Sequence, residues 1–201
     1  MAAPEDAWSA AVTLEGKRFR LEPLAAGHLG DLAAVAFEPR IWRWMPSQPA
    51  DVDALRAWLE QALANAARGT EVPFATVDRA SGRAIGSTRF LNILPEHRRL
   101  EIGYTWLGTQ FQRSGANREA KRLQLEHAFG TLGANRVEFK TDSLNEPSRT
   151  ALLGLGAIFE GILRNHMIMP GGRLRHSAYY SILAEEWPAV RARLNDAAGD
   201  R

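Results

Sequence analysis

The segment with the clearest chemical signal is a short loop, Gln112 to Asn117, that follows an expected strand and opens an expected helix. Backbone N–H groups at the start of a helix lack partners within the helix, and the helix dipole adds positive potential there. Such a loop suits a phosphate or pyrophosphate. Gly115 allows close backbone approach, and Arg113 and Arg118 add charge. The alternative is that Gly115 only shapes a tight turn and the arginines form a solvated surface.

Composition excludes several other chemistries. The chain has 201 residues and no cysteine, which rules out disulfides, zinc ribbons and a cysteine nucleophile. No histidine has a metal-ligand spacing with acids or other histidines, so we expect no metal. A net charge of +2 is weak for a nucleic-acid binder. No apolar run reaches the length of a membrane span, and the acidic N-terminus is unlike a signal peptide, so we expect a cytoplasmic protein.

Hydrophobic periodicity supplies the elements that must position the loop. Strands are expected at 13–24, 72–77, 84–93, 100–107, 136–141, 158–169 and 174–183, and helices at 26–37, 51–67, 115–132, 148–155 and 185–194. Two hairpins require antiparallel pairs, whereas the strand–helix–strand crossover in the second half requires a parallel pair. The expected fold is therefore α/β (α+β): a mixed, mostly antiparallel twisted sheet of about seven strands with helices on both faces.

One domain is expected at 13–194, after an N-terminal extension at 1–12 and before a flexible tail at 195–201. Within the expected strand 100–107, alternation places Leu100, Ile102, Tyr104 and Trp106 on one face. Glu101, Gly103 and Thr105 then share the other face.

The run from Glu101 to Trp106, followed by Phe111 to Ala120, resembles the acetyl-CoA-binding core of the GCN5-related N-acetyltransferases (GNAT). More narrowly it is similar to the branch that contains the ribosomal-protein acetyltransferases (RimJ/RimL-like). That family carries Gln/Arg-x-x-Gly-x-Gly/Ala at its pyrophosphate loop, where this chain has Gln112, Gly115 and Asn117. Asn117 departs from the small residue, mildly, because asparagine tolerates positive φ. The resemblance extends from about 14 to 187.

The resemblance implies a sheet splayed between the fourth and fifth strands and acetyl-CoA as cosubstrate. The contacts it implies for acetyl-CoA come from Gly103, Tyr104, Thr105, Gln112, Arg113, Ser114, Gly115, Ala116, Asn117, Arg118 and Asn145. It also implies a catalytic place for Ser148 near the departing thiolate. Asn145 has an alternative role as a helix N-cap, and Ser148 as a packed, hydrogen-bonded serine.

The acceptor side rests on fewer residues. Glu101 is the candidate base, direct or through water, and its alternative is an edge carboxylate paired with Arg98 or Arg99. By the resemblance, the segment with Trp42, Trp44 and Met45 roofs the acceptor cleft, where these residues form either a wall for an amine or a hydrophobic plug. His97 is expected to reach the same side.

The expected activity is transfer of acetyl from acetyl-CoA to a primary amine in a ternary complex. A protein N-terminus and a small amine both remain open as acceptors. A non-catalytic CoA-binding or regulatory module is the alternative. We expect neither a membrane nor direct nucleic acid as a partner, and a homodimer is left open.

Overall fold

The strands of the sheet pair in chain order except at the C-terminal end, where β8 lies between β6 and β7. The order is β1-β2-β3-β4-β5-β6-β8-β7. The computed structural model describes residues 3–199. The strands are β1 (Leu14–Glu15), β2 (Phe19–Pro23), β3 (Glu71–Asp78), β4 (Arg83–Leu94), β5 (Arg99–Leu107), β6 (Arg136–Asp142), β7 (Ile158–Ile168) and β8 (Leu174–Leu183). Among the strands of the described residues, only β5 and β6 pair in parallel. The mixed, mostly antiparallel open sheet predicted from the sequence is confirmed.

The sheet has eight strands because the expected first strand is divided by a turn. Lys17 and Arg18 donate their backbone N–H groups to the Glu119 carboxylate of the helix that follows β5. A side-chain carbon at Gly16 would clash with Glu119 Oε1 and with the Phe19 carbonyl oxygen, and the backbone oxygen cannot move aside, so glycine is required in this turn. This tertiary contact reverses the chain within a stretch whose apolar alternation predicted one strand.

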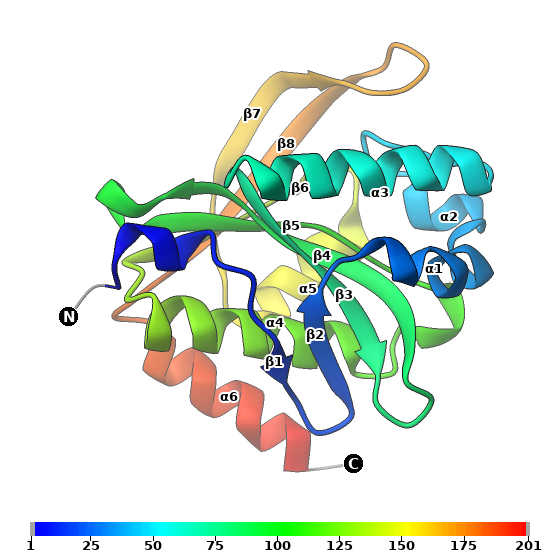
Figure 1. Cartoon of the computed structure of the whole chain (residues 1–201). Helices are drawn as coiled ribbons and strands as arrows, with labels where there is room; N and C mark the ends of the chain where they lie inside the picture. The colour runs from blue at the N-terminus through cyan, green and yellow to red at the C-terminus, as the bar shows by residue number, and fades with distance from the viewer. Residues whose placement is uncertain (1–2, 200–201) are drawn as a thin grey trace.

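Helices cover both faces of the sheet (Figure 1). One layer holds α1 (Leu29–Ala36), α2 (Pro39–Trp42) and α3 (Val52–Ala67), and the other holds α4 (Ala116–Glu126), α5 (Glu146–Leu155) and α6 (Trp187–Gly199). Short 3-10 turns lie at Glu5–Trp8, Ala26–His28, Pro95–His97 and Thr109–Phe111, and a π-helical turn at His127–Thr131 continues α4. Each layer has its own buried apolar cluster against the sheet.

The ends of the chain differ from the expected boundaries. Within the expected extension 1–12, Trp8 is buried in the main core. The last helix begins at Trp187 and runs to Gly199, so it enters the expected tail 195–201. Residues 1–2 and 200–201 of these segments lie outside the described residues.

The two central strands separate after a short paired stretch. β5 and β6 pair only at Arg99 with Arg136, at Leu100 with Val137, and at Glu101 with its partner on β6. Beyond Glu101, β5 continues to Leu107 beside β4 alone. The splay between the expected fourth and fifth strands is thus confirmed, and it begins directly after Glu101.

A β-bulge lies in β5 just past the point of separation. Arg89 of β4 pairs with Gly103 and Ser87 with Trp106, so two residues of β5 oppose one of β4, and Tyr104 has φ +47°. A bulge shifts the alternation of a strand by one residue. The expected faces are therefore wrong after Gly103: Tyr104 and Trp106 lie on the α3 face, and Thr105 turns toward α4.

Candidate active site

The loop before α4 is built around two left-handed residues. Arg113 has φ +62° and Gly115 has φ +92°. The Ser114 hydroxyl donates to the Phe111 carbonyl (2.7 Å) and accepts from the Ala116 N–H (3.3 Å), which holds the loop in place. A side-chain carbon at Gly115 would meet no atom within 4 Å, so space is open at the start of the helix. This geometry suits an anion at the helix N-terminus.

Donors at the first turn of α4 are available for such an anion. The amide N–H groups of Asn117 and Arg118 make no hydrogen bond to any residue within 3–199. Gln112 contributes from the other end of the loop, where its Nε2 donates to the Leu107 carbonyl (3.3 Å). The Gln112 hydrogen bond thus anchors the start of the loop, while the N–H groups at its helical end stay available to a ligand.

The arginines are arranged differently from the sequence expectation. Arg113 is exposed beside the loop, but the Arg118 guanidinium donates to the Arg193 carbonyl of α6 (2.8 Å) and ties two helices together. The Arg118 side chain is thus held toward α6, and its contact with a phosphate stays a prediction. Arg18, from the β1–β2 turn, instead reaches the Ser114 carbonyl with Nη1 (3.2 Å). No sequence signal pointed to Arg18, because the contact spans 96 residues.

Glu101 lies at the point where β5 and β6 separate, and only 2% of it is exposed. Its Oε2 accepts from Asn92 Nδ2 (2.8 Å) and from Lys140 Nζ (3.4 Å). The alternative pairing with Arg98 or Arg99 is wrong, because Arg98 donates to a loop carbonyl and Arg99 pairs with another carboxylate on β6. The carboxylate is held from two strands, at the edge of the splay.

Gly103 keeps the surroundings of Glu101 open. A side-chain carbon at Gly103 would lie 3.0 Å from Leu91 Cδ2 and 3.2 Å from Glu101 Oε1, so any larger residue would press against the carboxylate. The glycine and the bulge at Tyr104 together leave β5 backbone at the mouth of the splay with no strand on its β6 side.

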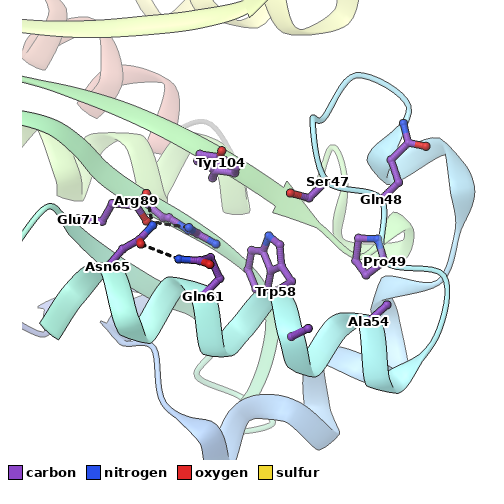
Figure 2. A pocket seen from close by; sticks show the side chains of 11 residues that line it. Ser47, Gln48, Pro49, Ala54, Trp58, Gln61, Asn65, Glu71, Arg89 and Tyr104 are labelled. Carbon is purple, nitrogen blue, oxygen red and sulfur yellow. Dashed lines mark hydrogen bonds and ion pairs between the residues drawn. The ribbon is translucent and has the colours of Figure 1, made fainter. Parts of the chain in front are cut away.

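A polar hollow of about 390 Å³ lies between α3 and β5; we call it the α3 hollow (Figure 2). The Arg89 guanidinium lies 4.7 Å from the Trp58 ring and 4.6 Å from the Tyr104 ring, and its Nη1 donates to Glu71 (2.7 Å). Asn65 donates to the other oxygen of Glu71. Arg89 Nε is buried without a partner among the described residues. Burial raises the pKa of Tyr104.

A second hollow, of about 650 Å³, lies beside Glu101 and is called the Glu101 hollow. Its other carboxylate, Glu138, is paired with Arg99 (3.1 Å) and Arg136 (2.9 Å). Tyr179 also lines it, and burial raises the pKa of that phenol. Every carboxylate that lines either hollow is thus paired with a basic side chain.

Trp42 belongs to the core rather than to a cleft wall. It is 3% exposed, its indole N–H donates to an α1 carbonyl (2.6 Å), and its ring packs on Trp58 and Trp106. For Trp42 the hydrophobic plug is the correct alternative, because α2, which the sequence did not predict, turns the side chain inward. Met45 packs half-buried against the same cluster.

Trp44 lies at a junction between the α2–α3 loop and β8. Its carbonyl accepts from Arg175 Nη1 (3.4 Å), and its ring lies 5.8 Å from the Arg173 guanidinium. His97 is separate from this region: it is exposed in the turn between β4 and β5 and lines neither hollow. The structure does not bring His97 to Trp44.

Asn145 caps α5, as the sequence predicted. Its Oδ1 accepts from the Ser148 N–H (3.2 Å), and Pro147 follows at the second helical position. The Ser148 side chain is half-buried, and its hydroxyl makes no hydrogen bond to the residues that the structure describes. The packed, hydrogen-bonded alternative for Ser148 therefore lacks its hydrogen bond.

Among residues 3–199, every helix is too short or too polar to span a bilayer. Within the same residues, no three His, Asp or Glu side chains meet in an arrangement that would hold a metal ion.

Comparison with known proteins adds the following. The acetyltransferase (GNAT) domain family matches residues 18–158. The uncharacterized N-acetyltransferase p20 of Bacillus licheniformis is 28% identical over 87% of this chain and 98% of that protein. A Bacillus subtilis protein provisionally named ribosomal N-acetyltransferase YdaF is 33% identical over 53% of this chain and 57% of its own. A GCN5-related N-acetyltransferase from Brucella melitensis superposes with a TM-score of 0.87 at 33% identity, covering 93% of this chain and 85% of that one. Mycobacterium smegmatis RimJ, solved with CoA-disulfide, shares the fold with a TM-score of 0.82 at 22% identity, covering 94% and 96%.

Proposed function

The chain belongs to the GNAT acetyltransferase family and is an acetyl-CoA-dependent acyltransferase, and we propose that it transfers acetyl to a primary amine by direct attack in a ternary complex. The similarities to YdaF and RimJ are consistent with the RimJ/RimL-like branch. The observation that carries the proposal is the separation of β5 from β6 directly after a buried glutamate, next to a bulge. This leaves unpaired strand backbone beside a carboxylate.

Acetyl-CoA binding follows from the same geometry. The diphosphate binds at the loop before α4, where the amides of Asn117 and Arg118 are free and Arg113 and Arg18 add charge. The backbone of β5 from Gly103 to Thr105, with no strand on its β6 side, binds the pantetheine and the acetyl oxygen. Each fixed N–H dipole aimed at a developing oxyanion typically stabilises the transition state by about 2.7–4 kcal/mol. Asn145 lies at the opposite lip of the splay, after β6.

Glu101 is the base in this proposal. Lys140 and Asn92 fix its carboxylate, which takes a proton from the incoming ammonium directly or through water. The neutral amine nitrogen then bonds to the acetyl carbon and the carbon–sulfur bond breaks. The thiolate takes a proton from the hydroxyl beside it, and that hydroxyl regains one from the nitrogen as the amide forms. The unpartnered Ser148 hydroxyl is the donor we assign to the thiolate.

The test compares Glu101→Gln with Glu138→Gln, because Glu138 is the register partner of Glu101 on β6. Thiol release from acetyl-CoA is measured with a panel of amines, and CoA affinity by calorimetry. Glu101→Gln should lower the rate by about 100-fold or more with unchanged CoA affinity. Glu138→Gln should keep most of the rate. Tight CoA binding without thiol release from any amine would favour the non-catalytic alternative instead.

A further inference from the structure

Arg175 is a buried cation without a carboxylate partner on the acceptor face. Only 4% of it is exposed, and its Nε has no partner among the described residues. Within residues 3–199 its side chain makes one hydrogen bond, from Nη1 to the Trp44 carbonyl at 3.4 Å, which is long. Burial lowers the pKa of Arg175, while the charges of Asp142 and Glu101 oppose that fall.

The neighbouring charges are already balanced. Lys140 pairs with Glu101 (3.4 Å), and Arg173 pairs with Asp142 (2.5 Å). In the α3 hollow, Arg89 and its glutamate form a third pair. Among these four cations, all within the described residues, only Arg175 has no carboxylate in contact, so its positive charge is not neutralised by an ion pair.

Arg175 lies on the α3 side of the sheet, the side of both hollows, although it lines neither. It comes from β8, in the hairpin that rises beside the α3 layer (Figure 1), and reaches across to the loop after α2. Burial raises the pKa values of Tyr104 and Tyr179, and the Arg175 charge opposes the rise in both. The Arg175 charge therefore acts on both phenols, one at the bulge on β5 and one lining the Glu101 hollow.

A desolvated guanidinium with unfilled donors is costly unless an anion pairs with it. We propose that the acceptor carries a carboxylate close to its amine and that Arg175 binds this carboxylate. The inference rests on the proposed function. Polycationic acceptors are disfavoured by the same geometry, because the carboxylates lining both hollows are already paired. An amine with a nearby carboxylate is either a free amino acid or a peptide with an acidic residue near its N-terminus.

The test uses matched acceptors that differ in one charge. Free serine is compared with serinamide, and the amidated peptide Ser-Glu-Ala with Ser-Gln-Ala, while spermidine serves as the polycation. Thiol release gives kcat/KM for each. We expect at least one carboxylate-bearing member to exceed its amide by about tenfold or more, since each tenfold corresponds to about 1.4 kcal/mol. The pair that shows the preference identifies the amino acid or the peptide as the source.

Variants assign the preference to Arg175. Arg175→Gln should remove it mainly through KM, and Arg175→Lys should retain part of it. Arg164→Gln removes an exposed charge from the same hairpin and should leave the preference intact. Circular dichroism and CoA affinity establish that each variant is folded.

Three results would overturn the inference alone: no charge preference in the wild type, a preference that survives Arg175→Gln, or an equal loss for charged and neutral acceptors. The last would place Arg175 on acetyl-CoA rather than on the acceptor. Absence of thiol release with every amine, despite acetyl-CoA binding, would overturn the proposed function and this inference together.

Discussion

We expect the stability of this protein to rise with pH above neutrality because of Lys121. This α4 side chain is 6% exposed, and its Nζ donates to Thr105 Oγ1 (2.6 Å), Thr88 Oγ1 (3.2 Å) and Gln124 Oε1 (3.3 Å). No carboxylate is among these partners, and burial lowers the pKa of Lys121 from 10.5 to about 7. Three neutral acceptors satisfy the ammonium's donors without neutralising its charge.

The direction follows from proton uptake. Below pH 7 the ammonium is charged in both states, and the folded state carries the full penalty of burying it. Between the folded and unfolded pKa values the unfolded chain binds more protons, so the free energy of unfolding rises with pH. The full penalty is about 5 kcal/mol at about 1.4 kcal/mol per pH unit, and roughly 2 to 3 kcal/mol of it is relieved between about pH 6.5 and 9.

The assay is urea unfolding of the wild type and Lys121→Met at several pH values across this range. The stability of Lys121→Met relative to wild type should fall by roughly 2 to 3 kcal/mol from about pH 6.5 to 9, as the wild type loses its penalty. Lys17→Met, which removes an exposed lysine, should show a constant difference. A constant difference for Lys121→Met would refute the reasoning, because it would mean that Lys121 titrates alike in both states.

Three further expectations concern residues around the site. Arg113→Ala should weaken CoA binding several-fold in low salt, as measured by calorimetry. Arg118→Ala should chiefly lower the free energy of unfolding in urea, by about 1 kcal/mol, because the Arg118 side chain ties α4 to α6. A loss of stability in Arg113→Ala with a loss of CoA affinity in Arg118→Ala would contradict these roles. Glu119→Ala should cost about 1–3 kcal/mol in urea unfolding, since two amides of the β1–β2 turn lose their acceptor, and an unchanged midpoint would contradict this. Gly103→Ala should raise the KM for acetyl-CoA and lower kcat, because the added carbon crowds Glu101; unchanged kinetics would show that this space is not used.

Local features were predictable because their causes lie within a few residues. Apolar alternation and turn residues predicted the order of most strands and helices, and the hairpins and the crossover predicted antiparallel pairs with at least one parallel pair. Asn145 could be identified as an N-cap because it lies just before Pro147 at the start of a helix. Gly115 marked the loop before α4 for the same reason: its left-handed φ is a local requirement.

Tertiary structure decided the contacts that span the chain. The bulge at Tyr104 arises from pairing with β4, and it moves Thr105 to the opposite face from the one that alternation predicts. The Arg118 side chain contacts α6, while Arg18 reaches the loop before α4 from the β1–β2 turn. A side chain's partner depends on where distant elements pack, and single-sequence periodicity carries no information on that.

The loop before α4 and Arg175 illustrate the two cases. Backbone conformation at Gly115 is a property of its own residues, so the sequence by itself could predict the shape of this loop, on which the proposed phosphate site rests. The unpaired charge of Arg175 exists only because packing assigns Asp142 to Arg173 and Glu101 to Lys140. Charge balance in a buried site is a sum over neighbours, and only the folded chain defines which neighbours those are.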